Sequence, residues 1–313
     1  MKTYLGLDLG GTNAKYGLVG SRGEVLERGR FSVRSERGPD GIIEEMIADL
    51  KALRDSAPSG GKPLGLTVGA AGRILTDEGV LVFAPNLPGW RNVPLAGRLS
   101  EALDMEVHLV NDADLYTLGE WLAGAGSGLD NLVGFTLGTG VGGGLILGGR
   151  LFTGSFGSAA EIGHMVIEPD GLPCGCGSRG CLETIASATA MTRTAREWLA
   201  EGRSSAFQGR PDDLTAATLF DMARQGDRLA LEVFERVGWA LGLALTSIFN
   251  ILGLEGAVIG GGASAAYEFF LPRMRKELAS RVFAVDADRV RLAQATLGDD
   301  ACLAGAPAMF AGR

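Results

Sequence analysis

The chain has 313 residues, of which 46% are hydrophobic and 21% are charged, a composition typical of a globular protein with a sizeable core in one large domain or two. Its 37 acidic and 29 basic residues give a formal net charge of −8. This balance, without clustered Lys and Arg, argues against a nucleic-acid or membrane-surface partner.

The N-terminal sequence MKTYLGLDLGG contains no long apolar core and no small-residue cleavage site, so it does not have the pattern of a secretory signal. The most apolar stretch, residues 239–262, contains Asn250 and Glu255 and changes from a helical to a strand-like pattern. We interpret it as a buried helix and strand rather than a membrane span. We therefore expect a cytoplasmic protein, in which thiols stay reduced.

The first predicted elements are strands arranged as a hairpin. Short apolar runs separated by GGTN and SRG indicate three strands, at residues 3–10, 14–20 and 24–33. Apolar spacing and a Pro-Asp start then predict a helix at 39–57. The elements that follow are a strand at 63–72, a helix at 93–104 and a strand at 106–112.

The early pattern recurs in the second half of the chain. Residues 131–154 again give strand, Gly-rich turn, strand, turn and strand, which indicates a duplicated domain. Later helices are predicted at 115–122, 182–202, 214–226 and 229–252, and later strands at 257–262 and 289–295.

We place the domain boundary at residue 114. The smaller N-terminal α/β domain comprises residues 1–114, and a C-terminal helix at about 299–313 is expected to pack back on it. The larger α/β domain comprises residues 115–298. Because clefts between domains are usual ligand sites, the active site is expected between the halves.

Glycine is the unusual component, with 49 residues, and it clusters in four turns. Because glycine lets the backbone approach a ligand closely, these turns favour a polyanion cradled by main-chain N–H groups. In DLGGTNAK, the turn residues Gly10, Gly11 and Thr12 could bind phosphate, and Lys15 adds a positive charge. Asp8 could hold Mg²⁺ directly or through water. On its own, this turn is equally compatible with an ordinary hairpin.

Two later turns favour the phosphate-binding interpretation over an ordinary hairpin. In LGTGVGGG, Thr139 lies between Gly138 and Gly140, which repeats the mixture of a hydroxyl and exposed main chain. Gly261 and Gly262 follow a strand and could let an adenine or ribose approach the backbone. Two phosphate turns and one nucleotide-side turn together resemble the actin, Hsp70 and sugar-kinase superfamily.

A Cys₃His set lies between residues 161 and 183, where three of the four cysteines and one of the two histidines occur. His164, Cys174, Cys176 and Cys181 are enough for one closed tetrahedral zinc site. Buried thiols or a disulfide pair are the alternatives. Both fit poorly with a polar, Gly-rich loop in a cytoplasmic chain.

The strand at 106–112 leads into VNDAD, which offers two carboxylates. Phosphoryl transfer needs mainly positioning, charge neutralisation and one group that takes the proton of the acceptor hydroxyl. We interpret Asp114 as an acid at the first turn of the next helix, although its charge could also raise the pKa of Asp112.

The motifs DLGGTNAK, APNLPGW, NDAD and LGTGVGGG occur in this order over nearly the whole chain, and the Cys-rich stretch completes the set. Together they resemble the ROK family (repressors, open reading frames and sugar kinases). The resemblance implies an α/β fold of two RNase H-like domains of the actin/hexokinase type, with mixed sheets flanked by helices and a cleft between them. Asp114 departs from the family, which more commonly has Asn there.

The resemblance implies an ATP- and Mg²⁺-dependent sugar kinase in which Asp112 acts as the base toward the 6-hydroxyl. Glucose is the first expected substrate, with fructose, allose, N-acetylmannosamine and N-acetylglucosamine as alternatives. The implied sugar contacts are Asn86, Asn111, Asp112, Glu161, His164 and Glu183. A structural zinc would shape this pocket, with one ring nitrogen of His164 on the metal and the other on a sugar hydroxyl.

Several alternatives stay open. Polyphosphate could replace ATP, although the acidic chain favours ATP. A ROK repressor would carry a helix-turn-helix domain before the first Gly turn, which here begins at residue 8, and a non-catalytic sugar sensor is a further possibility. Asn86 could be a turn residue beside Pro85, and Trp90, His108 and Cys302 are interpreted as structural. A homodimer or higher oligomer is implied by the family alone.

Overall fold

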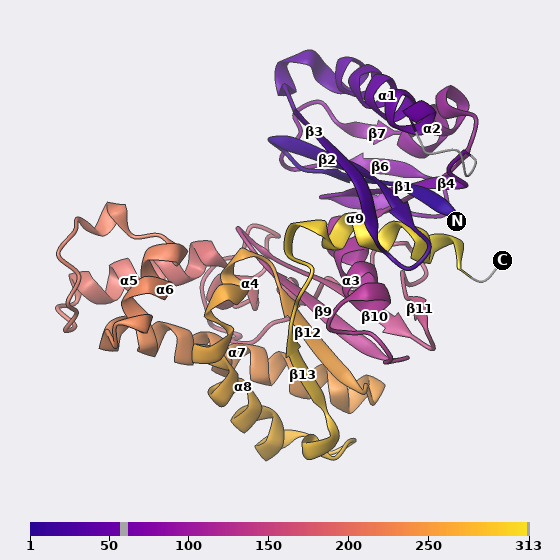
Figure 1. The fold of residues 1–313 in the computed structure, drawn as a ribbon. Coiled ribbons are helices and arrows are strands. Elements are labelled where there is room, and N and C mark those ends of the chain that lie inside the picture. The colour runs from indigo at the N-terminus through magenta and orange to yellow at the C-terminus, as the bar shows by residue number, and fades with distance from the viewer. Residues whose placement is uncertain (57–61, 312–313) are drawn as a thin grey trace. The chain divides into compact units, whose positions relative to one another are not determined.

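The computed structural model describes residues 1–56 and 62–311, which form two compact units (Figure 1). The first unit contains residues 1–134, 144–160 and the segment from 296, and the second contains residues 135–143 and 161–295. The first unit extends past residue 114, and the division of domains at that residue stays a prediction. Ala57 of the predicted first helix and residues 312–313 of the predicted last helix lie outside the described residues.

A five-stranded sheet of order β3-β2-β1-β4-β8 forms the centre of the first unit. β1, β2 and β3 pair antiparallel, whereas β1 pairs with β4, and β4 with β8, in parallel. This mixed sheet confirms the predicted fold class. Its strands are β1 (Thr3–Leu9), β2 (Asn13–Gly20), β3 (Val25–Ser32), β4 (Gly65–Ala70) and β8 (Glu106–Asn111).

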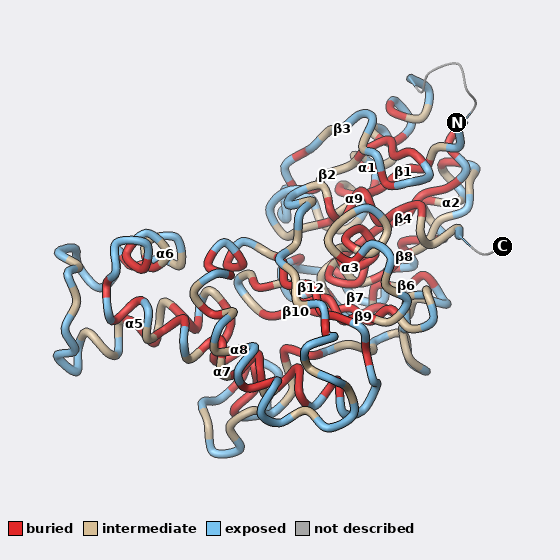
Figure 2. The backbone as a smooth tube through the Cα atoms, turned by 60° about the horizontal axis from the view of Figure 1, so that its bottom comes forward, coloured by how far each residue is buried: buried red, intermediate tan, exposed pale blue. Residues whose placement is uncertain are grey.

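Helices cover both faces of this sheet, which is why β4 is buried along its whole length (Figures 1 and 2). On one face lie α1 (Gly38–Ser56) and α2 (Leu95–Leu103), which pack against each other. On the other face lie α3 (Asp112–Ala123) and the short α9 (Ala301–Gly305).

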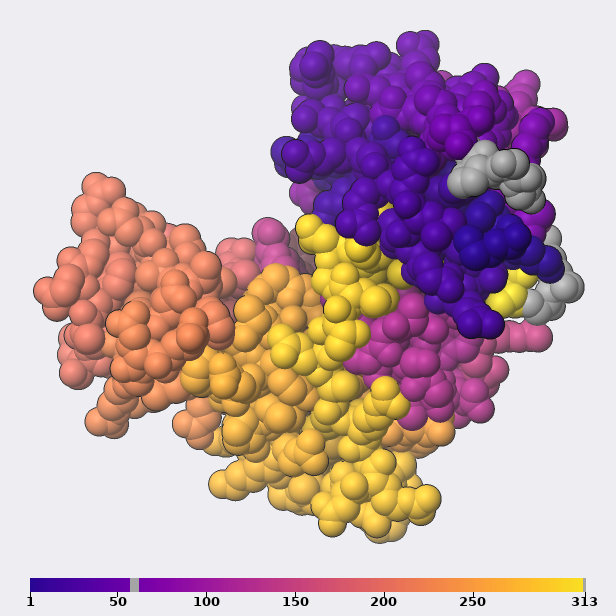
Figure 3. Space-filling view, viewed as in Figure 1, coloured from indigo at the N-terminus to yellow at the C-terminus, as the bar shows by residue number. Residues whose placement is uncertain are grey.

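Residues 296–311 complete the core of the first unit. The 3₁₀ helix Ala306–Phe310 follows α9, and both contact β1; yellow atoms of the C-terminal segment lie beside indigo atoms of the N-terminal one in Figure 3. The buried hydroxyl of Thr67 donates to the carbonyl oxygen of Ala306 (2.9 Å). The buried carboxylate of Glu120 in α3 accepts from the N–H groups of Thr296 (2.9 Å) and Leu297 (2.8 Å).

The predicted helix at 299–313 is thus wrong in detail, since α9 ends at Gly305 and a tighter 3₁₀ helix containing Pro307 follows. Proline lacks the N–H that a continuing α-helix would need.

A small sheet in the first unit was not predicted. β5 (Arg73–Leu75), β6 (Val80–Phe83) and β7 (Arg91–Val93) have three or four residues each, too few to show a period. The loop between β6 and β7 carries Asn86, which is exposed, and Trp90, whose exposed fraction is 1%. The interpretation of Trp90 as a packing residue is confirmed.

A second five-stranded sheet has the order β11-β10-β9-β12-β13. β10 and β11 form an antiparallel hairpin, and β12 and β13 pair in parallel. This topology matches that of the first sheet, in agreement with the predicted duplication. The strands are β9 (Leu132–Leu137), β10 (Val141–Leu147), β11 (Arg150–Leu151), β12 (Gly256–Gly260) and β13 (Arg291–Gln294).

The helices of the second unit gather around α7 (Arg228–Leu252), which contacts α5 (Ala188–Ala200), α6 (Ala216–Arg224) and α8 (Tyr267–Arg281). Asp227 caps α7 by accepting from the N–H of Ala230 (3.0 Å). Within residues 1–56 and 62–311, α7 included, no helix has the length and apolarity that a membrane crossing requires.

The helix predicted at 182–202 is divided in two, so that expectation is corrected. The short α4 (Glu183–Ala186) ends before Ser187, whose backbone is extended (φ −75°, ψ 155°). The hydroxyl of Ser187 accepts from the N–H of Ala190 (3.1 Å) and so caps α5.

Candidate functional site

The first Gly-rich turn joins β1, which ends at Leu9 just after Asp8, to β2. The N–H of Gly10 donates to the carbonyl oxygen of Asn13 (3.1 Å) and closes the turn. A Cβ at Gly11 would lie 2.7 Å from the Cβ of Asn86, closer than real Cβ contacts. Glycine therefore lets the predicted phosphate turn pack directly on the loop that carries a predicted sugar contact.

The other members of this turn face outward. Thr12 is exposed. The Nζ of Lys15 lies 3.2 Å from Oδ1 of Asp299, whose side chain is exposed. Asp299 was not among the predicted site residues, because its place beside Lys15 depends on the return of residues 296–311 to this sheet. A phosphate that reaches Lys15 would have to compete with this carboxylate.

Asp112 is the first residue of α3, and the preceding strand ends at Asn111, one residue earlier than predicted. The side chain of Asn111 explains the boundary, since its Oδ1 accepts from the N–H of Ala113 (2.8 Å) as an N-cap. Its amide also donates to the carbonyl oxygen of Gly72 (3.4 Å). Asp114 lies in the same first turn of α3, where negative charge is favourable, and is 3% exposed.

Asp8 and Asp112 both have a raised pKa. Burial raises the pKa of Asp8 to about 6, with a further increase from the charge of Asp112 and an opposing effect of Lys15. Burial also raises the pKa of Asp112, although the N–H of Ala113 donates to its Oδ1 (3.0 Å). Two such carboxylates in one unit can divide the work between a proton acceptor and a cation ligand.

The second Gly-rich turn joins β9 to β10, and the N–H of Gly138 donates to the carbonyl oxygen of Gly140 (3.0 Å). Two of its carbonyl oxygens are bound by the start of α5. The N–H of Ala188 donates to Gly138 (2.8 Å), and the hydroxyl of Thr189 donates to Thr139 (2.9 Å). These bonds fix the turn while the side chain of Thr139 stays exposed.

A cavity of about 370 Å³ adjoins this turn within the second unit, and its wall is mostly apolar. Phe220, Phe234 and Met191 line it together with Gly262. Such a slot suits a flat aromatic ring, whose polar edge can remain toward solvent. The neighbouring Gly261 has φ +81°, and a Cβ there would lie 2.5 Å from the carbonyl oxygen of Leu137.

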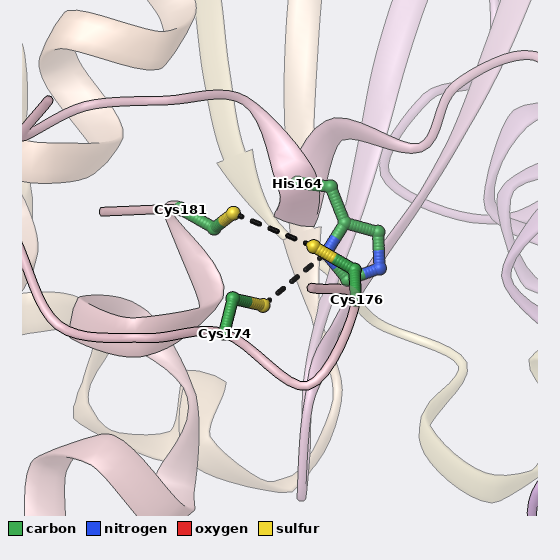
Figure 4. A group of neighbouring side chains, drawn as sticks. All are labelled: His164, Cys174, Cys176 and Cys181. Atoms are coloured by element: carbon green, nitrogen blue, oxygen red, sulfur yellow. Dashed lines mark hydrogen bonds between the residues drawn. The ribbon is translucent and has the colours of Figure 1, made fainter. Parts of the chain in front are cut away.

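The four predicted metal ligands lie together in the second unit (Figure 4). His164 ends a 3₁₀ helix (Ile162–His164), and the three cysteines follow on a loop that the isolated bridges Val166↔Cys181 and Pro173↔Arg179 close. The sulfur atoms of Cys176 and Cys181 are 3.8 Å apart, and Nδ1 of His164 is 3.6 Å from the sulfur of Cys174. All four ligand atoms lie within 4.8 Å of one another.

These distances fit a tetrahedral zinc ion. Sulfur ligands about 2.3 Å from zinc lie about 3.8 Å apart, and a sulfur and a nitrogen ligand lie about 3.5 Å apart. Burial raises the pKa of Cys174 to about 12, so its thiolate needs a neighbouring cation. The donor atoms are therefore suited to zinc, and Nδ1 of His164 is the nitrogen that faces the cluster.

Two predicted sugar contacts lie against this cluster. Nε2 of His164, the nitrogen that faces away from the cysteines, lies 3.9 Å from Oε2 of Glu161. Glu183 begins α4; its Oε1 is 3.7 Å from the sulfur of Cys174, and its Oε2 accepts from the N–H of Val141 (3.0 Å). The second unit thus brings together Glu161, His164 and Glu183, whereas Asn86, Asn111 and Asp112 belong to the first.

Sequence reasoning missed the apolar walls of the cavity and the partner of Lys15. Phe220 and Phe234 have ordinary helical spacing, which does not distinguish a cavity wall from the core. Cys302 and His108 have the structural roles that were expected. Cys302 is 8% exposed, with its sulfur 3.6 Å from the carbonyl oxygen of Asp112, and His108 packs on Phe310 with ring centres 4.7 Å apart.

Two sheets of one topology, each with a Gly-rich turn in its hairpin, and a carboxylate at the start of the helix after the first sheet define a protein of the sugar-kinase class. More specifically, the chain belongs to the ROK family, whose model matches residues 4–313.

Similar proteins cover almost the whole chain. A glucokinase from Thermotoga maritima is 38% identical over 98% of this chain and 96% of its own length. A glucokinase from Halalkalibacterium halodurans is 37% identical over 96% of this chain and 93% of its own length. The solved structure of a ROK family glucokinase from Streptomyces griseus, in complex with glucose and AMPPNP, has a TM-score of 0.79 and 32% identity, with 98% of each chain covered.

Proposed function

We propose that this protein is an ATP-dependent sugar kinase that phosphorylates the 6-hydroxyl of glucose. The two glucokinases at 38% and 37% identity support this activity, as does the glucose and AMPPNP complex of the Streptomyces griseus relative. The observation in this chain that carries the proposal is Asp112, a half-buried carboxylate with a raised pKa at the start of α3.

Asp112 is the proposed base. It accepts the proton of the 6-hydroxyl while the sugar oxygen forms a bond to the γ-phosphorus of ATP. The bond from that phosphorus to the bridging oxygen breaks, and ADP leaves. Asn111 caps α3, so we assign it a positioning role for the carboxylate beside its proposed sugar contact.

The proposed sugar contacts in the first unit are Asn86, Asn111 and Asp112. Those in the second unit are His164, Glu161 and Glu183, and each of the two Glu carboxylates can bind two adjacent hydroxyl groups. A hydroxyl of the wrong configuration would leave the groups that bound sugar covers without a partner, which is the proposed basis for selecting one hexose.

ATP is the proposed phosphate donor. Gly10, Gly11, Thr12 and Lys15 would bind phosphate in the first unit, and Gly138, Thr139 and Gly140 in the second. The apolar cavity beside Gly261 and Gly262 would take the adenine ring. Mg²⁺, held by Asp8 directly or through water, would neutralise phosphate charge.

A structural zinc on His164, Cys174, Cys176 and Cys181 is part of the proposal. The ion would fix the loop that ends at Glu183 and commit Nδ1 of His164, which leaves Nε2 for a sugar hydroxyl. We further propose that the protein works in the cytoplasm as a homodimer or higher oligomer, and that its domains divide near residue 114.

The test is ADP release by the purified protein with Mg·ATP over a panel of hexoses and N-acetylhexosamines. Glucose should give the highest kcat/KM, 6-deoxyglucose should give no turnover, and the product should carry its phosphate on C6 by NMR. Polyphosphate should not replace ATP, and removal of zinc by a chelator should lower turnover. A panel that peaks on another sugar would correct the substrate, and no turnover from folded, zinc-loaded protein would overturn the kinase.

A further inference from the structure

One face of α7 forms ion pairs with three different parts of the second unit. Glu232 lies 3.5 Å from Arg203 in the segment after α5, and Glu235 lies 2.8 Å from Arg273 in α8. The third pair joins Arg236 to the metal-binding loop. Its Nη2 donates to both carboxylate oxygens of Glu168, at 2.8 Å and 3.0 Å.

Glu168 lies at the base of the metal-binding loop, where the first and last residues of the loop meet. The N–H groups of Ile167 and Glu168 both donate to the carbonyl oxygen of Gly180, at 2.8 Å and 3.1 Å. The carbonyl oxygen of Glu168 in turn accepts from the N–H of Gly171 (2.8 Å). We call residues 167–171 together with Gly180 the neck of the loop.

The neck leaves no room for a side chain at Gly180, where φ is +64° and a Cβ would lie 1.5 Å from the carbonyl oxygen of Glu168. Cys181 follows directly, and His164 lies four residues before Glu168. A shift of the neck would therefore change the spacing of two metal ligands.

The position of Arg236 is fixed from a second side. Its guanidinium lies 6.0 Å from the ring centre of Trp239, one turn along α7. Both residues line a surface hollow of about 420 Å³ with Trp198 and Glu168. On another face of α7, Phe234 lines the apolar cavity proposed for adenine, so this helix contacts both the metal-binding loop and the nucleotide cavity.

We propose that Arg236 is a positioning residue that acts through Glu168, and that this ion pair sets the neck so that His164 and Glu183 are held for the sugar. The sugar part of this inference rests on the proposed function. The pair joins a loop with little regular structure to the longest helix of the unit, so its loss is expected to loosen the loop rather than unfold the unit.

The test compares Glu168→Gln with Glu235→Gln. The control makes the same chemical change in an ion pair that joins α7 to α8 rather than to the loop. Glu168→Gln should raise the KM for glucose roughly threefold to tenfold, as expected for a partly exposed ion pair, with the KM for ATP within about twofold of wild type. Zinc release to a chromophoric chelator should accelerate by a similar factor. Glu235→Gln should change neither.

The exchanged pair Glu168→Arg with Arg236→Glu should restore part of the zinc retention. Zinc release at the wild-type rate from Glu168→Gln would overturn the proposal, as would equal effects in the control variant. If the wild-type protein does not phosphorylate glucose, the proposed function fails, whereas the zinc-release comparison still decides whether the ion pair holds the loop.

Discussion

The two five-stranded sheets have the same topology but carry different chemistry. In the first sheet, the hairpin turn follows Asp8, and the last parallel strand is followed by Asp112, and both carboxyl groups have a raised pKa. At the corresponding point before the second turn the residue is Thr136, and β13 is followed by Ala295. The second sheet instead adjoins an apolar cavity.

This difference shows how a duplicated fold can divide one reaction. The topology supplies a Gly-rich turn in each half, because a hairpin at the same place in each sheet needs one. The side chains at the strand ends then determine the role of each half. We infer that the first half handles protons and the cation beside its phosphate turn, whereas the second half binds the adenine ring and phosphate with uncharged groups.

The largest effect is expected for Asp112→Asn. The amide cannot accept the proton, so kcat should fall by about 10³-fold, a magnitude usual for loss of a general base. The KM values for glucose and ATP should change little, because the new side chain has the same shape. Steady-state kinetics measure this, and a kcat within tenfold of wild type would place the base elsewhere.

The next effect is expected for Asp8→Asn. Loss of a carboxylate near the cation should lower kcat/KM for Mg·ATP by about a hundredfold. The matched change in the second half, Thr136→Val, should lower it far less. Similar losses of kcat/KM in both variants would contradict the proposed division of roles between the two halves.

Asp8→Asn should also stabilise the free protein in a pH-dependent manner. The pKa of Asp8 is raised from 3.8 to about 6, so the folded state binds the proton more tightly than the unfolded state. The free energy of unfolding of wild type therefore decreases as pH rises from about 4 through about 6, and the loss is complete above that range. At pH 8 the variant should be more stable by roughly 3 kcal/mol, and the difference should vanish as the pH falls below the unfolded-state pKa of 3.8. Thermal unfolding without Mg²⁺ and nucleotide tests this, and an equal gain at both pH values would indicate a steric cause.

The smallest effects are expected where each Gly-rich turn packs against a residue that is proposed to bind the sugar. A Cβ at Gly11 would meet the Cβ of Asn86 at 2.7 Å, whereas one at Gly140 would meet Oε2 of Glu183 at 2.4 Å. The end of a Glu side chain can move but a Cβ cannot. Gly11→Ala should therefore cost about 1 to 3 kcal/mol of stability, and Gly140→Ala should mainly raise the KM for glucose, about threefold to tenfold. Denaturant unfolding and kinetics of both variants decide this, and the reverse ranking in stability would contradict it.

The sequence predicted best what local spacing encodes. Glycines in DLGGTNAK and LGTGVGGG, and the spacing of Cys174, Cys176 and Cys181, mark turns and ligands within a few residues of each other. The sequence did not reveal Lys15 beside Asp299, Arg236 on Glu168, or Phe220 as a cavity wall, because these contacts join distant segments. Ser187 shows the remaining difficulty, since one capping hydroxyl divided a helix that apolar spacing had predicted as continuous.

The return of residues 296–311 to the first sheet has a consequence for synthesis of the chain. Asp112 emerges from the ribosome early, but its helix packs on α9, and its carbonyl oxygen contacts Cys302. Glu120 on the same helix is satisfied by Thr296 and Leu297. During translation the core of the first unit therefore cannot be completed until residues 296–311 have been synthesised, and part of that core stays exposed until then. A chain that ends before residue 296 would lack α9, against which the helix of the proposed base packs.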